Sequence, residues 1–202
     1  MKKISLLFLS FAALLNAHAA NQFVTVNGND SSDGLSWGNA KTTIQEAIKV
    51  ATAGDTVFIA AGVYYQMVQM KDGVHLFGGY DALTGQRDVD AYATILDGTG
   101  LNAQLLKFGT CKQTTYADGL VLQNANHTSN GGAVAMGKNA VLNRCVVSSC
   151  YTDGSGGGVY NNAGLVSNCV VELCEALGAS GAVHNSGGAI VENTIIRGCK
   201  GN

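Results

Sequence analysis

The last seventy residues of the chain contain one pattern three times. It reads GGAVAMGKNAVLNRCVVSSC at 131–150, GGVYNNAGLVSNCVVELC at 157–174 and GAVHNSGGAIVENTIIRGC at 181–199. Equivalent positions recur every 24 or 25 residues, and each copy consists of short β-prone runs separated by Gly and Asn. A constant period of this size is typical of a solenoid, in which each repeat packs only against its neighbours. The stretch therefore predicts an all-β coiled architecture.

Four positions of the repeat carry similar side chains in each copy. They are Val134, Val159 and Val183; Val141, Leu165 and Ile190; Cys145, Cys169 and Thr194; and Cys150, Cys174 and Cys199. Strand-like runs bounded by turn formers also occur at 55–60, 73–77, 93–97 and 119–122. Counting these runs, we expect residues 55–202 to form a single-stranded right-handed parallel β-helix of about six or seven coils.

The segment ahead of the coils has a helical period. Apolar residues recur at i, i+3, i+4 and i+7 between positions 41 and 53, Thr43-x-x-Glu46 matches a capping box, and Gly54 is a stop signal. The first coil of a solenoid exposes an open sheet edge and an open core. We therefore expect residues 20–54 to form a strand, a turn and a helix that caps this end.

Residues 1–19 have the pattern of a cleavable secretory signal. Lys2 and Lys3 precede an apolar run at 4–15, and Ala17-His18-Ala19 offers small residues where signal peptidase cuts. A retained membrane anchor is the alternative, but the run is short for a span. We expect an exported protein, whether secreted, periplasmic or on the cell surface, with no transmembrane segment after cleavage. Cleavage takes the net charge from −2 to −4, and without a basic run the chain is not expected to bind nucleic acid.

All six cysteines lie in the second half of the chain, and the sequence leaves two interpretations open. Residues on adjacent coils lie about 4.8 Å apart, which a disulfide tolerates. Export would allow bridges such as Cys150–Cys174 or Cys145–Cys169. The alternative is a set of free thiols stacked in the core as small apolar side chains.

The turn-forming run at 27–34 contains the weak calcium candidates Asp30 and Asp33. Their spacing does not match an EF-hand loop, and the competing interpretation is a solvated turn. The sequence offers no CxxC or HxxxH spacing for zinc. No cofactor is expected, with calcium as the possible exception.

Several motifs in order along the chain carry a family resemblance. They are Asn29-Asp30-Ser31-Ser32-Asp33-Gly34-Leu35-Ser36-Trp37, Thr43-Ile44-Gln45-Glu46-Ala47-Ile48, Gly54-Asp55-Thr56-Val57, Ala61-Gly62-Val63-Tyr64, Phe77-Gly78-Gly79-Tyr80 and Thr94-Ile95-Leu96-Asp97-Gly98. This order resembles the N-terminal segment of bacterial secreted right-handed parallel β-helix repeat proteins of the pectin-lyase-like superfamily. It is similar also to polymorphic outer-membrane proteins. The resemblance implies the fold and not one function, because that superfamily holds lyases, hydrolases, adhesins and passive stalks.

Strand alternation assigns an inner and an outer face to each late coil. With Cys145 facing inward, the outward positions include an apolar ridge of Val146, Val170 and Ile195. On the same face, Glu172 and Arg197 become cross-strand neighbours one coil apart. Such a ridge marks a contact surface unless another segment covers it. A second outward column runs through Ala135, Tyr160 and His184, where an aromatic ring beside a histidine could stack on a sugar.

Catalysis has weaker support in the sequence. A glycosidase needs two carboxylates across the scissile bond, and the middle coils offer Asp88, Asp90, Asp97 and Asp118. The last two stand in Asp-Gly pairs, where the side chain usually braces the backbone. A lyase base near a calcium cluster is not apparent either, since none of Arg87, Arg144 and Arg197 stands beside such a cluster in sequence.

We therefore expect a non-catalytic exported β-helix that presents a flat surface for adhesion or glycan contact, with Tyr160, His184, Glu172 and Arg197 as ligand-binding candidates. One alternative is a polysaccharide lyase or glycosidase with cryptic or missing catalytic residues, and another is a structural spacer. A polysaccharide or cell-surface partner fits the first of these. After Cys199 no capping element follows, which suggests a truncated chain or end-to-end self-association.

Overall fold

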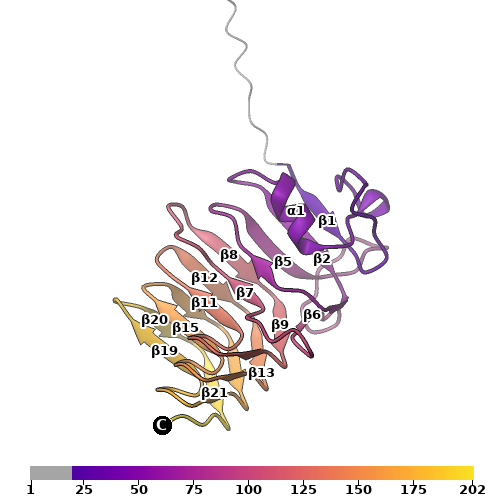
Figure 1. The fold of residues 1–202 in the computed structure, drawn as a ribbon. Helices are drawn as coiled ribbons and strands as arrows, with labels where there is room; N and C mark the ends of the chain where they lie inside the picture. Colours follow the sequence, from indigo (N-terminus) through magenta and orange to yellow (C-terminus); the bar gives the residue numbers. More distant parts are fainter. Residues whose placement is uncertain (1–19) are drawn as a thin grey trace, which may run out of the picture.

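The computed structural model describes residues 20–202, and the expected signal peptide at 1–19 lies outside the described residues. The chain winds into a stack of coils that runs from the N-terminal region to the last strand, as Figure 1 shows. Every ladder between the described strands is parallel, and the strands line up into four sheets, named sheets A to D below. The prediction of an all-β parallel solenoid is confirmed.

Each sheet collects one strand from successive coils. Sheet A contains β1 (Gln22–Val24), β2 (Thr56–Ala60), β5 (His75–Tyr80), β8 (Thr115–Asp118), β12 (Ala140–Asn143), β16 (Leu165–Ser167) and β20 (Ile190–Glu192). Sheet B contains β3 (Gly62–Tyr64), β6 (Thr94–Asp97), β9 (Leu120–Gln123), β13 (Val146–Ser148), β17 (Val170–Glu172) and β21 (Ile195–Arg197). Sheet C contains β4 (Val68–Gln69), β7 (Leu106–Lys107), β11 (Val134–Met136), β15 (Val159–Asn162) and β19 (Val183–Ser186). Sheet D contains β10 (Asn126–His127), β14 (Tyr151–Thr152) and β18 (Glu175–Ala176).

The solenoid has about four regular turns, so the predicted six or seven coils are too many. The regular turns are β7–β10, β11–β14, β15–β18 and the last set β19–β21. The prediction counted the strand-like runs at 73–77 and 93–97 as two coils. They overlap β5 of sheet A and β6 of sheet B, which are two sides of the same coil. A strand-like run therefore marks one side of a coil, not a whole coil.

Inward-facing side chains from all coils form one elongated apolar core. In the late coils, Leu122, Val147 and Val171 stack in register and are fully buried. At the other end the core is continuous with the buried face of the helix. Because each coil contributes only a few apolar residues, neighbouring coils must bury one another's faces.

The helix α1 (Ile44–Val50) is shorter at both ends than the predicted 41–53. At its start, the Thr43 hydroxyl accepts the Glu46 N–H as predicted. At its end, the Asp55 carboxylate accepts the Thr52 N–H and hydroxyl, which fixes a turn where the helix would otherwise continue. The helix packs on β1, β2 and β4 at the N-terminal end of the stack (Figure 1). Within residues 20–202, no helix has the length and apolar character needed to cross a membrane.

The cysteines are free thiols and occupy the corners of the coils. The Cys145 thiol donates to the Asn143 carbonyl, and Cys169 and Cys174 donate to the carbonyl two positions earlier in the same way, at 3.1–3.2 Å. The Thr194 hydroxyl makes the equivalent bond in the last coil, at 2.8 Å. Each of these thiols thus donates to a carbonyl at a corner, and a Thr hydroxyl can make the same bond, which explains why one repeat position holds Cys145, Cys169 and Thr194.

The residue just before each of these corner positions has left-handed backbone geometry. Leu173 has φ +55° and its side chain is 62% exposed, so it contributes little packing to balance the strain. We expect Leu173→Asn to raise the free energy of unfolding by about 1 kcal/mol, because Asn tolerates this conformation better than Leu. Urea unfolding would measure the change. Leu177→Asn is the control, since Leu177 is 53% exposed without a positive φ, and an equal gain there would contradict the explanation.

Candidate functional site

Seven rings gather on the outer side of sheet A and form what we name the aromatic face. Phe23, Phe58 and Phe77 stand at paired positions of β1, β2 and β5. Strand alternation turns these three side chains away from the core. The complete set is Phe23, Trp37, Phe58, His75, Phe77, Tyr80 and Tyr116.

The rings of the aromatic face contact one another in an unbroken series. The centroid separations range from 4.8 Å between Phe23 and Trp37 to 6.4 Å between Phe58 and Phe77. His75 stacks on Phe77 and meets Tyr116 edge-on. All seven side chains retain some exposure, and Tyr116 is 37% exposed. The face is therefore a partly accessible aromatic surface, a type of surface that suits the apolar faces of sugars.

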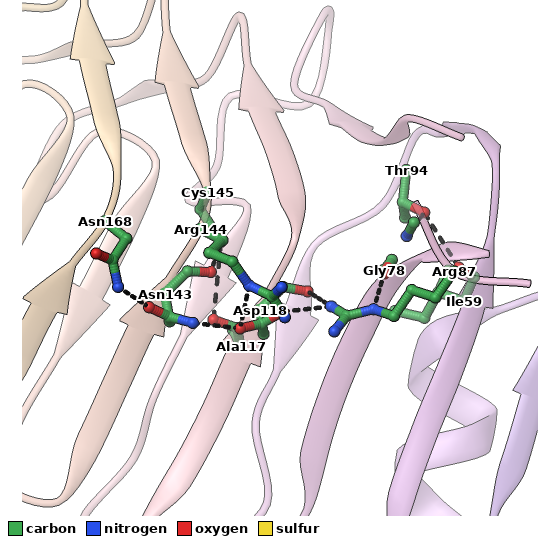
Figure 2. Close-up of polar contacts among 11 residues, drawn as sticks. Ile59, Gly78, Arg87, Thr94, Ala117, Asp118, Asn143, Arg144, Cys145 and Asn168 are labelled. Atoms are coloured by element: carbon green, nitrogen blue, oxygen red, sulfur yellow. Dashed lines mark hydrogen bonds and ion pairs between the residues drawn. The ribbon is translucent and has the colours of Figure 1, made fainter. Parts of the chain in front are cut away.

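At the end of β8, two arginines meet the carboxylate of Asp118, whose side chain is 6% exposed. Figure 2 shows Arg87 and Arg144 approaching this carboxylate from opposite sides. Arg144 binds both oxygens, through Nη2 at 2.6 Å and Nε at 3.2 Å, while Arg87 donates from Nη2 to the first oxygen. Asn143 also donates to the carboxylate, and Asn168 donates to Asn143 at 2.8 Å. We name these five residues the polar corner.

Arg87 connects the polar corner to the aromatic face. It belongs to the insertion at 81–92, and its Nε donates to the Gly78 carbonyl at 2.9 Å. Its guanidinium carbon lies 5.0 Å from the centroid of Phe77 and 5.5 Å from that of Tyr80. A guanidinium over aromatic rings is attracted by their negative faces. The Arg87 side chain thus helps to hold the insertion against the solenoid through ionic, hydrogen-bonding and ring contacts, together with a backbone bond from the Asp88 N–H to the Gly79 carbonyl at 2.8 Å.

Arg144 occupies an unusual backbone position for its residue type. Its φ is +49°, and the corresponding corner positions of the neighbouring coils are Gly119, Asn168 and Asn193, which tolerate such values. An arginine there is strained, and strain of this kind persists where the side chain has a specific role. Its guanidinium is 48% exposed while it binds Asp118. The Nη1 groups of Arg144 and Arg87 have no hydrogen-bond partner within residues 20–202, so they can donate to a ligand.

The electrostatics keep the corner ionised. Burial raises the pKa of Asp118, but the bonds from Arg144, Arg87 and Asn143 outweigh it and lower this pKa below its ordinary value. The bond to Asp118 raises the pKa of Arg144. Asp97 behaves similarly, since burial is outweighed by bonds from Thr99, Gln123 and Asn124 that lower its pKa to about 2. Both carboxylates are acceptors in these networks. The predicted backbone bracing is present at Asp97, which accepts the Thr99 N–H, whereas the donors to the Asp118 carboxylate within residues 20–202 are side chains.

The ligand-binding candidates predicted from the sequence fall on two different sheets. Tyr160 and His184 are in register on sheet C, with rings stacked at 5.2 Å and 9°. Glu172 and Arg197 are in register on sheet B and form an exposed ion pair at 2.6 Å. The two pairs do not share a groove, and residues 20–202 form no pocket. Each pair exists as predicted, but the structure does not combine the four residues in one site.

The apolar ridge is present and is longer than predicted. Val146, Val170 and Ile195 are in register on sheet B, and the column continues through Val121 and Ile95 to Val63. Its two ends are the most exposed, with Val63 at 41% and Ile195 at 58%. No described segment lies over these two ends.

The turn proposed for calcium is contacted by the ammonium group of a lysine from outside the turn. The buried Lys41 ammonium donates to the Asp30 and Ser32 carbonyls at 3.2 and 2.8 Å. The Asp30 carboxylate accepts N–H groups of Thr42 and Thr43, and that of Asp33 accepts the Leu35 N–H. The positive charge inside this turn therefore comes from the chain itself. Among the described residues, no group of three or more His, Cys, Asp or Glu side chains is arranged to hold a metal.

Sequence reasoning missed both the polar corner and the aromatic face. The convergence of Arg87 and Arg144 on Asp118 was not expected, because the three residues lie far apart along the chain. One signal was available in the sequence. Arg144 stands where the next coils have Asn168 and Asn193, and an arginine in an asparagine column points to a role for its side chain.

Comparisons with known proteins give remote structural likenesses. No family model and no curated protein matches the chain. Among solved structures, pectin methylesterase PemA from Erwinia chrysanthemi is similar with a TM-score of 0.47 and 15% identity, over 90% of this chain and 67% of that one. A rhamnogalacturonan lyase is similar with a TM-score of 0.37 and 16% identity, over 91% of this chain and 51% of that one. The chain thus spans about two thirds and about half of these two proteins.

Proposed function

We propose that the protein is an exported β-helix that contacts polysaccharide through the outer side of sheet A. The observation that carries the proposal is the junction of the aromatic face with the polar corner, where Arg87 touches both. Sugar rings have apolar faces and polar edges, so a protein surface that binds them combines aromatic rings with hydrogen-bond donors. The export rests on the N-terminal signal pattern.

The chemistry of the surface suits binding at an open face. A ligand would stack on the exposed rings, Tyr116 foremost, while the spare guanidinium donors of Arg144 reach hydroxyl or carboxylate oxygens. Tyr160 and His184 on sheet C provide a second, smaller contact of the same kind. A polymer is the fitting ligand, because a flat surface without a pocket gains affinity by repeated weak contacts.

The enzyme alternative meets a specific difficulty in this site. A glycosidase needs a carboxylic acid that remains protonated near neutral pH, hence one with a raised pKa. The pKa values of Asp97 and Asp118 are lowered instead, and their oxygens are engaged by neighbouring side chains. These two residues are therefore better suited to hold the surface in place than to donate a proton. The spacer alternative predicts no ligand at all.

We expect Arg144→Asn to weaken polysaccharide binding by about tenfold, because it removes charge-assisted donors worth about 1.5 kcal/mol or more. The replacement matches the asparagines at the equivalent corners, so the fold should persist. Tyr116→Ala should weaken binding by a similar factor through loss of stacking. Binding would be measured on acidic and neutral polysaccharides, with calcium present and then chelated. Circular dichroism and thermal unfolding would verify that each variant is folded.

Arg197→Asn is the matched control, since Arg197 is an exposed arginine on sheet B, away from the aromatic face. It should bind as the unmodified chain does. Loss of binding in this variant alone would move the contact to the late coils, and absence of binding by the unmodified chain would favour a spacer. New reducing ends or unsaturated products would establish catalysis and contradict the non-catalytic proposal.

A further inference from the structure

Three thiols form a column along the corner that follows sheet B. Cys150, Cys174 and Cys199 come two residues after the strand ends Ser148, Glu172 and Arg197, which are paired in register. Adjacent coils are about 4.8 Å apart, within the Cα separation that a disulfide accepts. Backbone hydrogen bonds join adjacent coils at this column, since the Glu175 N–H donates to the Cys150 carbonyl and the Lys200 N–H to the Cys174 carbonyl, each at 2.8 Å. Two alternative bridges, Cys150–Cys174 and Cys174–Cys199, are therefore sterically available in one column.

Accessibility distinguishes the two bridges. Cys150 and Cys174 are each 1% exposed, whereas Cys199 is only partly buried. The last described coil is also more open, since Ile196 is 51% exposed although its register partner Val171 is fully buried. A dissolved disulfide can therefore reach Cys199 first, and the nearest thiol to it within the column is Cys174.

We propose that Cys174 and Cys199 are a disulfide-forming pair, and that Cys150 stays a thiol when they are oxidised. The Cys199 thiolate, having lost its proton to solvent, attacks one sulfur of a low-molecular-weight disulfide and releases the other half as a thiolate. The Cys174 thiolate then attacks the Cys199 sulfur of this mixed disulfide, forms the Cys174–Cys199 bond and releases the second half. In total, two protein thiols lose two electrons and two protons, and the small disulfide is reduced to two thiols.

The bridge has a structural consequence for the coil that bears it. It would tie β21 covalently to β17, the strand with which it pairs among the described residues. The oxidised sulfurs would lose the hydrogen bonds that the Cys174 and Cys199 thiols donate to the Glu172 and Arg197 carbonyls, at 3.2 and 3.5 Å. This loss costs little, because a thiol is a weak donor. Oxidation therefore staples the last described coil. This inference is independent of the proposed polysaccharide contact.

The test is incubation of the reduced protein with oxidised glutathione at pH 8.5, followed by alkylation and peptide mapping. Burial raises the pKa of the Cys199 thiol, so alkaline pH supplies more of the attacking thiolate. Cleavage after Glu172, Glu175, Arg197 and Lys200 puts Cys174 and Cys199 on separate short peptides, with Cys150 on a third. We expect the 173–175 and 198–200 peptides to be linked and Cys150 to be alkylated.

Hydrogen exchange supplies the second readout. Oxidation should slow exchange in β21 by up to about a hundredfold, because closing a loop of this length contributes about 3 kcal/mol and 1.4 kcal/mol is tenfold. Cys199→Ser should abolish both the linked peptide and the slowing, whereas the matched variant Cys150→Ser should retain both. A Cys150–Cys174 link, a glutathione adduct that stays on Cys199, or six alkylated cysteines would each overturn the proposal.

Discussion

Gly157→Ala should lower the free energy of unfolding by about 3 kcal/mol or more. A methyl group at Gly157 would meet the carbonyl oxygens of Gly181 and Glu175, which belong to the backbone and cannot rotate away. Gly132 and Gly181 make the same close approach to the next coil, so a glycine stands near the start of each quoted repeat for a steric reason. Urea unfolding of the variant measures the loss.

Gly137→Ala serves as the matched control for Gly157→Ala. Its added methyl would have only the Asn162 carbonyl oxygen nearby, at 3.7 Å, and Gly137 does not have a positive φ. We expect no loss, and a gain of up to about 1 kcal/mol from the stiffer unfolded chain. Equal destabilisation by the two variants would show that corner glycines serve flexibility and not close packing.

Asp118→Asn should be the second large effect, with a loss of about 3 kcal/mol at pH 7. Removing the shared charge leaves Arg87 and Arg144 side by side without a counter-ion, and breaking a buried pair costs about 3–5 kcal/mol. The lower end applies here because water screens Arg144, whose side chain is 48% exposed. The insertion at 81–92 should also loosen, since Arg87 holds it.

The acid limb of the stability curve tests the same group. The pKa of Asp118 is lower in the folded chain than in the unfolded chain. Its contribution to the free energy of unfolding is therefore fully present above the unfolded pKa of about 3.9 and is lost as pH falls through the folded pKa. The unmodified chain should therefore lose more stability between pH 5 and pH 2 than Asp118→Asn. Guanidinium unfolding at both pH values measures this. Asp153→Asn, which removes an exposed carboxylate bound to the Tyr151 hydroxyl, is the control for the loss of one negative charge at the surface. A parallel acid limb for Asp118→Asn would mean that the arginine contacts do not stabilise the fold.

The late coils could be predicted from the sequence because two periods coincide there. The alternation of strands and the spacing of 24 or 25 residues together place Glu172 beside Arg197 and Val146 beside Val170. The start of the helix could also be predicted, since the Thr43 side chain caps it by accepting the N–H of Glu46, only three residues further along the chain. Local chemistry and constant spacing are the information that a single sequence carries most directly.

The aromatic face could not be predicted because its strands have no common spacing. Phe23 pairs with Phe58, Phe58 with Phe77 and Phe77 with Asp118, at sequence separations of 35, 19 and 41 residues. Insertions of different length between these strands hide the register. Arg87 reaches its partner from such an insertion, so its distance from Asp118 in space is unrelated to its distance in sequence.

The parallel ladders have a mechanical consequence. Backbone hydrogen bonds between coils run along the stacking axis, so tension on the two ends loads every interface between coils in series. A series arrangement yields at its weakest link and transmits no more force than that link bears. Among the described interfaces, the one between β17 and β21 has the most exposed side chains, since Ile195 and Ile196 are 58% and 51% exposed, so it should open first while the polar corner and its surface stay folded.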